Sequence, residues 1–126
     1  MLGVFYKYLL YEKLKGYILN DQPLALLSDI ATEAHALIQR DFKDINPVVG
    51  VSRNMRSKGI PADAMTVDCL KTGKRIILIL HDDNTDVVLY QFSFKAEDPS
   101  DEFLSIQLSD LTVQKLYGWI QSYFLK

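Results

Sequence analysis

The strongest concentration of chemically active side chains lies in the sequence ILHDDNTDVVLYQF, between two apolar runs. It brings together one imidazole and three carboxylates, from His81, Asp82, Asp83 and Asp86. The spacing Asp-x-Asn-x-Asp from Asp82 to Asp86 is that of the first half of a calcium-binding loop. Such a loop needs Gly at its sixth position and Glu at its twelfth, where this chain has Val87 and Ser93. We therefore expect a turn and no metal site, with the acids accepting local backbone hydrogen bonds.

The apolar runs on either side of these acids predict a β-hairpin. Pairing Leu80 with Val88 and Asp82 with Asp86 leaves residues 83–85 as a three-residue loop, which is a common hairpin length. One face of this hairpin should be buried in the core, because it carries Ile76, Leu78, Leu80, Val88, Tyr90 and Phe92.

The opposite face of the same hairpin is also apolar. It carries Ile77, Ile79, His81 and Leu89, with Val87 beside them. A fully exposed face of this composition would be an unusual apolar patch, so either another part of the fold or a partner covers it. We therefore predict that Ile77, Ile79, His81 and Leu89 contribute to a partner interface.

A basic segment provides a second candidate site. Arg53, Arg56 and Lys58 lie within the longest stretch without clear periodicity, residues 41–61, and glycines flank them. Such residues could contact an anionic small ligand or a nucleic-acid backbone. Nucleic acid is the less favoured partner, because three cations supply little affinity on a chain of net charge -2.

Covalent catalysis is the third alternative, and it depends on Cys69, the only cysteine. A cysteine nucleophile needs a base, and the chain has only His35 and His81 to offer. Cys69 alternates with Met65 and Val67, which is typical of a small core residue in a strand. We expect no catalytic residue and no cofactor, and a single cysteine is typical of a reducing, cytoplasmic setting.

The elements that position these residues follow from hydrophobic periodicity. Residues 2–19 predict a helix that is apolar on most sides, which packs within the fold or pairs with a second chain. A second helix begins near Pro23, and its apolar stripe faces a core. Four strands then form an antiparallel meander, with a glycine turn at Gly73 between the first two, although a brief strand at 48–51 is an alternative. A final helix runs from about Asp110 to Phe124, with Ser109 as its N-cap.

This order predicts a single α+β domain over residues 1–126, with two N-terminal helices, a four-stranded antiparallel meander and a C-terminal helix packed on the sheet. The hydrophobic fraction of 48% and the charged fraction of 24% are those of an ordinary globular chain. No apolar run is long enough to cross a bilayer, so we expect no membrane attachment. The leading hypothesis is a small, soluble, non-enzymatic interaction or accessory module that forms a homo-oligomer or binds a protein partner.

Overall fold

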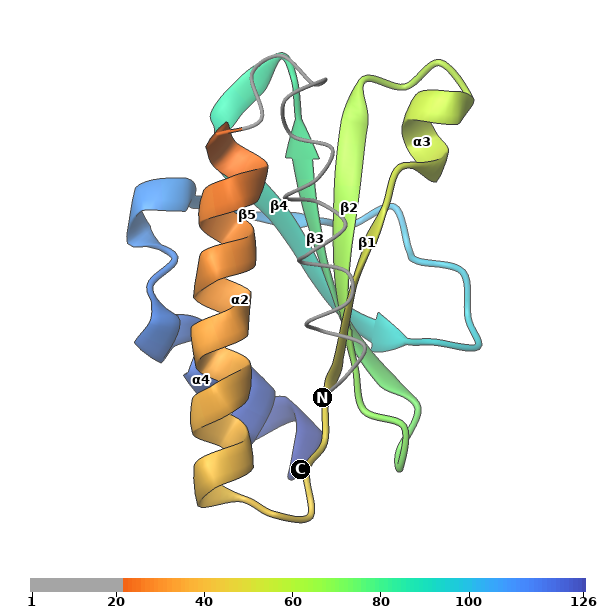
Figure 1. The fold of residues 1–126 in the computed structure, drawn as a ribbon. Helices are drawn as coiled ribbons and strands as arrows, with labels where there is room; N and C mark the ends of the chain where they lie inside the picture. Colours follow the sequence, from red (N-terminus) through yellow and green to blue (C-terminus); the bar gives the residue numbers. More distant parts are fainter. Residues whose placement is uncertain (1–21) are drawn as a thin grey trace.

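A computed structural model describes residues 22–126 as one antiparallel sheet with helices packed against it (Figure 1). In chain order the elements are α2 (Gln22–Asp41), β1 (Val48–Ser52), α3 (Asn54–Ser57), β2 (Ala62–Asp68), β3 (Lys74–His81), β4 (Asn84–Phe94), β5 (Leu104–Gln107), the 3-10 helix η2 (Leu108–Asp110) and α4 (Val113–Phe124). This is the α+β class that the sequence predicts. The helix predicted over residues 2–19 lies outside the described residues, and so does the choice between packing within the fold and pairing with a second chain.

The sheet has five strands rather than the four predicted, in the order β1-β2-β3-β4-β5. The additional strand is β1, which pairs with β2 from Val48 opposite Asp68 to Ser52 opposite Ala64. It comes from the segment interpreted mainly as a loop, because it is only five residues long and contains Gly50, so its own pattern is weak. The hydrogen bonds to the longer β2 hold this segment in the extended conformation, although its own sequence pattern does not predict a strand.

The core lies between one face of the sheet and the two longer helices. On α2 the predicted stripe is buried almost throughout, at Leu24, Leu27, Ile30, Ala31, Ala34 and Ile38. On α4 the buried positions are Leu116, Ile120 and Phe124. They meet the inward side chains of β2, β3 and β4, of which Met65, Val67, Ile76, Leu78 and Val88 are 0–1% exposed. We call this face of the sheet the inner face and the opposite one the outer face.

The β3–β4 pairing confirms the predicted register but corrects the predicted turn. Ile79 lies opposite Leu89, which is the register that the Leu80–Val88 pairing implies. A bulge between Ile79 and His81 then shifts the pairing, so that His81 lies opposite Asn84. Between these two pairs β3 advances by two residues and β4 by five, so β4 holds three extra residues there. The connection is a two-residue turn at 82–83 and not the three-residue loop expected.

The start of α4 also differs from the prediction. The helix begins at Val113, and its N-cap is Thr112, whose hydroxyl oxygen accepts a hydrogen bond from the backbone N–H of Lys115 at 3.1 Å. The segment that contains Ser109 forms η2 instead, with Leu108 buried on the core side. Both Ser and Thr are good caps, so their side chains alone do not decide between the two positions.

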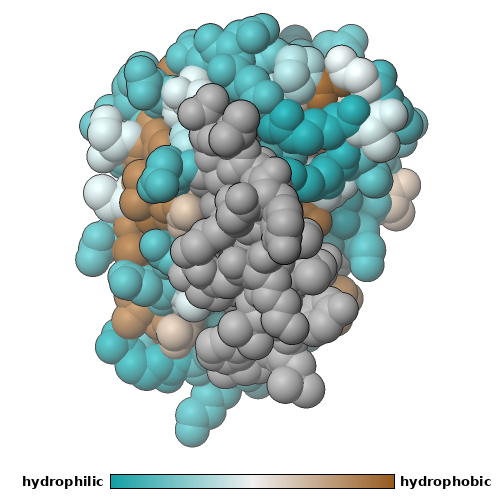
Figure 2. All heavy atoms as spheres, turned by 45° about the horizontal axis from the view of Figure 1, so that its top comes forward, coloured by the Kyte–Doolittle hydropathy of each residue, from teal (hydrophilic) through white to brown (hydrophobic). Residues whose placement is uncertain are grey.

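Polar side chains make up the larger part of the coloured surface in Figure 2, and apolar ones gather on its left side, where α2 and α4 lie in Figure 1. None of the helices within residues 22–126 is long and apolar enough to span a bilayer.

Candidate functional site

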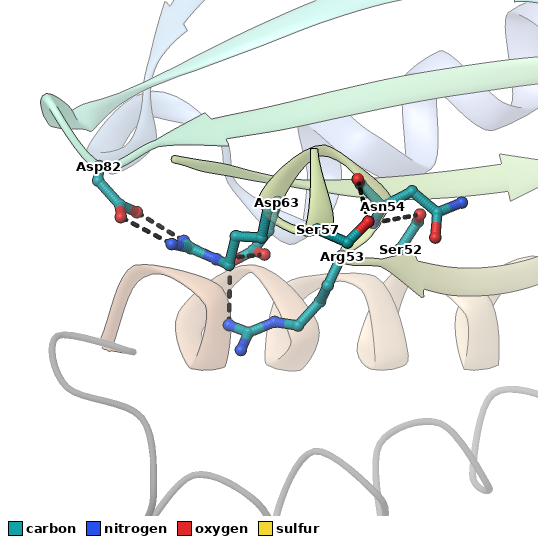
Figure 3. Close-up of polar contacts among 7 residues, drawn as sticks. Ser52, Arg53, Asn54, Ser57, Asp63 and Asp82 are labelled. Atoms are coloured by element: carbon teal, nitrogen blue, oxygen red, sulfur yellow. Dashed lines mark hydrogen bonds and ion pairs between the residues drawn. The ribbon is translucent and has the colours of Figure 1, made fainter. Parts of the chain in front are cut away.

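The predicted basic site lies at one end of the sheet, where α3 packs beside β2 and near the β3–β4 turn (Figures 1 and 3). We call it the arginine corner and define it by Arg53, Arg56, Asp63 and Asp82. Asp63 points from β2 to the inner face and is 4% exposed. It accepts hydrogen bonds from Arg53 Nη2 at 3.0 Å, from Arg56 Nε at 2.9 Å and from Arg56 Nη2 at 3.0 Å.

Arg56 joins two carboxylates that are far apart in the sequence. Besides binding Asp63, it donates from Nη1 and Nη2 to the two oxygens of Asp82, at 2.8 and 2.6 Å. These hydrogen bonds, those from Asp82 first, raise the pKa of Arg56 above its ordinary value. In return the guanidinium of Arg56 lowers the pKa of Asp82. Both shifts favour the charged forms of Arg56 and Asp82, which short, charge-assisted hydrogen bonds join.

These contacts occupy the arginines that the sequence predicts as an anion-binding site. The structure brings Arg53 and Arg56 together, but it pairs them with Asp63 and Asp82, so the guanidinium hydrogen bonds go to carboxylates of the same chain. Lys58, the third predicted residue, is exposed and forms no ion pair with any residue in the range 22–126. The corner is thus built as a structural junction between α3, β2 and the β3–β4 turn.

The predicted partner interface lies on the outer face of β3 and β4. Ile77 is buried there at 8% exposure, whereas Ile79, His81 and Leu89 are half-buried. Beside them, Arg75 binds Asp68 on the neighbouring strand at 2.6 Å. The four residues share one face as expected, and none of them is fully exposed.

The residues of the enzyme alternative lie far apart or are engaged elsewhere. Cys69 is buried at the end of β2, opposite Lys74, whereas His81 lies opposite Ala62 at the other end of the same strand pair. Seven residue steps along a strand place them about 23 Å apart. His35 is 2% exposed and donates its Nε2 hydrogen to the Pro47 carbonyl oxygen at 2.8 Å. Among residues 22–126 no group of three or more His, Cys, Asp or Glu is placed to hold a metal ion.

One recess with a mixed lining was not predicted. An open cavity of about 520 Å³ lies between the end of β4, residues 90–94, and the connection that leads to β5. We call it the rim groove. Four aromatic side chains and three carboxylates line it, from Tyr90, Phe92, Phe94, Phe103, Glu97, Asp98 and Glu102. Phe92, Phe94 and Leu104 are unusually exposed for large apolar residues, at 38%, 42% and 59%.

Gln91 holds one wall of the rim groove in place. Its side-chain nitrogen donates to the backbone oxygens of Ser100 and Glu102 and to the Ser100 hydroxyl, at 2.9–3.1 Å. Its side-chain oxygen accepts from the Ser100 N–H at 3.0 Å. Because Gln91 alternates with Tyr90 and Phe92, it points to the outer face, and its hydrogen bonds fix the β4–β5 connection on that side of the sheet.

The strand edge beside the rim groove is open. β5 pairs with β4 only from Val87 to Tyr90. The Lys95 N–H donates to Gly73 O, so odd-numbered residues of β4 direct their backbone groups to β3 and even-numbered ones to the β5 side. The Phe92 N–H and C=O and the Phe94 N–H therefore point past the end of β5, and they form no hydrogen bond there with any described residue.

An aromatic cluster under the rim groove connects it to α4. Trp119 stacks on Tyr90 with ring centroids 4.4 Å apart and meets Phe92 edge-on at 5.7 Å. Tyr123 lies 5.1 Å from Phe92, and burial, followed by the negative charge of Glu97, raises its pKa. The ammonium of Lys74 lies 5.2 Å from the ring centroid of Tyr123, and it also donates hydrogen bonds to the backbone oxygens of Tyr123 and Lys126.

Sequence reasoning missed the rim groove because its parts carry different signals. Alternation predicts that Tyr90 and Phe92 lie in the core, and the polar run that follows β4 carries no pattern that indicates a recess. One signal is the mismatch between the eleven residues of β4 and the four of β5, which leaves seven residues of β4 without a partner on the β5 side. No family model, curated protein or solved structure matches this chain.

Proposed function

We propose that this protein is a non-enzymatic interaction module that associates with a protein partner or with a second copy of itself through the rim groove. The observation that carries the proposal is the exposure of Phe92, Phe94 and Leu104 beside an unpaired strand edge. Exposed apolar side chains that gather in one place are typical of protein contact sites. An open edge strand offers backbone hydrogen bonds to a second chain.

The predicted outer-face interface fits the same proposal as a neighbouring surface. Ile79 and Leu89 lie on the face toward which the β4–β5 connection folds, so a partner seated at the rim groove could extend onto them. The anionic-ligand alternative has less support, because Arg53 and Arg56 already bind carboxylates. Enzymatic function has the least, because Cys69 is buried and distant from His81.

The proposal is tested by a paired substitution at the rim. Phe94→Ser with Leu104→Ser removes two exposed apolar side chains, and Leu26→Ser with Leu70→Ser removes two others, which are 47% and 64% exposed. Light scattering over a concentration series measures self-association, and affinity capture from the native source measures partner retention. We expect the rim pair to lose whichever association the wild type shows and the control pair to keep it.

The same assay separates the two candidate surfaces. Loss of association in Ile79→Ser with Leu89→Ser, but not in the rim pair, would move the interface to the outer face. A wild type that stays monomeric at all concentrations and retains no partner would contradict the proposal.

A further inference from the structure

We propose that the rim groove binds an extended, lysine- or arginine-bearing segment of a partner protein, which adds to the open edge of β4 and places a cation among the aromatic rings and carboxylates. This inference rests on the proposed function and names the chemistry of the partner. Three independent features of the groove support it: its charge, its aromatic lining and its backbone.

The charge of the rim groove is uniformly negative. Glu97, Asp98 and Glu102 line it, and none of the lysines and arginines within residues 22–126 does. None of these three carboxylates forms an ion pair with a residue in the described part of the chain. Unmatched carboxylates around a recess favour a cationic partner, through faster encounter and through selection against anionic segments.

The aromatic lining favours the same class of ligand. The faces of Tyr and Phe rings attract an ammonium or guanidinium group within about 6 Å of the ring centre. Lys74 makes this contact with Tyr123 at 5.2 Å. Phe92 and Phe94, which line the groove, are partly exposed, and no lysine or arginine of residues 22–126 makes such a contact with them.

The backbone determines the shape of the ligand. The Phe92 N–H and C=O and the Phe94 N–H point into the space that a neighbouring strand would occupy. A peptide that adds there as a strand would satisfy these groups through main-chain hydrogen bonds. Its alternate side chains would then point to the two faces of the sheet. One set would meet Phe92 and Phe94, and the other would meet the connection held by Gln91.

The chain carries a reporter for this test. Trp119 is the only tryptophan, and it contacts Tyr90 and Phe92, which line the rim groove. The probe is a capped peptide of about six residues, a usual strand length, that alternates valine and lysine. A matched peptide has glutamate in place of lysine. We expect the lysine peptide to change Trp119 fluorescence saturably and the glutamate peptide to have no effect.

Substitutions then assign the signal to the groove. The triple variant Glu97→Gln, Asp98→Asn and Glu102→Gln removes three negative charges from the groove. Its affinity for the lysine peptide should be about tenfold lower, because three exposed ion pairs are lost. The matched control, Glu33→Gln with Asp44→Asn and Asp110→Asn, changes net charge equally at exposed sites elsewhere and should change affinity by less than about twofold. Phe94→Ala should weaken binding about threefold through loss of a cation–π contact. A thermal melt of each variant confirms that it is folded.

Backbone methylation of the peptide tests strand addition. Methyl groups on the N–H of every second residue block hydrogen bonding to one side of the peptide. We expect one of the two alternating patterns to abolish binding and the other to be tolerated. Equal binding by both methylated peptides would overturn strand addition.

The outcomes separate this inference from the proposed function. If the lysine peptide does not bind, or binds equally to the groove triple variant and its control, the inference is wrong. The proposed function would still stand if Phe94→Ser with Leu104→Ser abolished association in the assay above. If the wild type forms dimers through the rim instead, the occupant is a second copy and not a basic segment.

Discussion

The arginine corner and the rim groove both contain carboxylates, which are paired in the first and unpaired within the described residues in the second. In the corner, Asp63 and Asp82 receive five hydrogen bonds from Arg53 and Arg56. At the rim, the carboxylates of Glu97, Asp98 and Glu102 have no ion pair within residues 22–126, and aromatic rings lie beside them.

This difference shows that a cluster of charges in a sequence does not identify a binding site by itself. The sequence predicts that the basic segment at 53–58 can bind an anionic ligand. In the fold, acids from β2 and from the β3–β4 turn form ion pairs with it instead. The acidic residues at 97–102 form no clear motif in the sequence, and in the fold three of them line a recess beside the short β5. What matters for binding is whether each charge has a partner in the folded chain.

The comparison predicts that removing a corner carboxylate is costly and removing a rim carboxylate is not. Asp63→Asn leaves two guanidinium groups facing a neutral amide in a buried position, and we expect a loss of about 2–3 kcal/mol in the free energy of unfolding. Glu97→Gln should change it by less than about 0.5 kcal/mol. Urea unfolding of both variants measures the difference, and equal losses would remove the distinction between the two regions.

The position of the β4–β5 connection at the rim groove should depend on the side-chain amide of Gln91 rather than on ion pairs. Gln91→Leu removes the hydrogen bonds to Ser100 and Glu102, and we expect a loss of about 1–2 kcal/mol in unfolding free energy. Hydrogen exchange should also become faster in the connection at 95–103, because its main anchor is lost. Gln114→Leu, an exposed change on α4, is the control. Unchanged exchange in the connection would show that other contacts hold it.

The core between the two regions should respond to pH through His35. Burial lowers the pKa of His35, although its hydrogen bond to the Pro47 carbonyl opposes this effect. A histidine with a lowered folded pKa stabilises the fold fully above the unfolded value of about 6.5, and this stability is lost as the pH falls below it and through the folded pKa. We expect unfolding free energy to decrease between about pH 7 and pH 5. His35→Gln keeps a hydrogen-bond donor and should flatten the decrease; an unchanged slope would assign it to other groups.

The smallest effect should come from the exposed half of the corner. Asp82 has a side chain that is 50% exposed, so Asp82→Asn should cost no more than about 1 kcal/mol at neutral pH. Because Arg56 lowers the pKa of Asp82, this contribution is present above the ordinary Asp value of about 4 and is lost as the pH falls through the folded pKa. The pH dependence of urea unfolding, compared between wild type and variant, tests both statements.

The Asp82→Asn variant also tests whether the arginine corner binds an anion when one of its carboxylates is removed. Asp82→Asn frees part of Arg56, so inorganic phosphate should bind the variant more tightly than the wild type in low salt, as measured by calorimetry. Phosphate that binds the wild type tightly, and loses affinity in Arg53→Ala with Arg56→Ala, would instead support the anionic-ligand alternative.

Local patterns in the sequence were enough for most of the elements. The spacing of apolar residues from Leu24 to Ile38 predicts α2, and the alternation around Ile76 and Val88 predicts the β3–β4 register that the structure confirms. Gly73 has a φ of 77°, as the tight turn between β2 and β3 requires. These features depend on neighbours in the chain, so a sequence pattern records them directly.

Other features depended on contacts between distant residues, and only the tertiary structure decided them. The weak segment from Val48 to Ser52 became a strand because β2 was there to pair with it. Arg56 binds Asp82, which lies 26 residues away in the chain, whereas no lysine or arginine of residues 22–126 forms an ion pair with the rim carboxylates. Sequence alone therefore determined which faces are apolar and where the charges lie along the chain. The fold decided which charges neutralise one another, because Coulomb energy and hydrogen bonding depend on distance in space and not on separation in sequence.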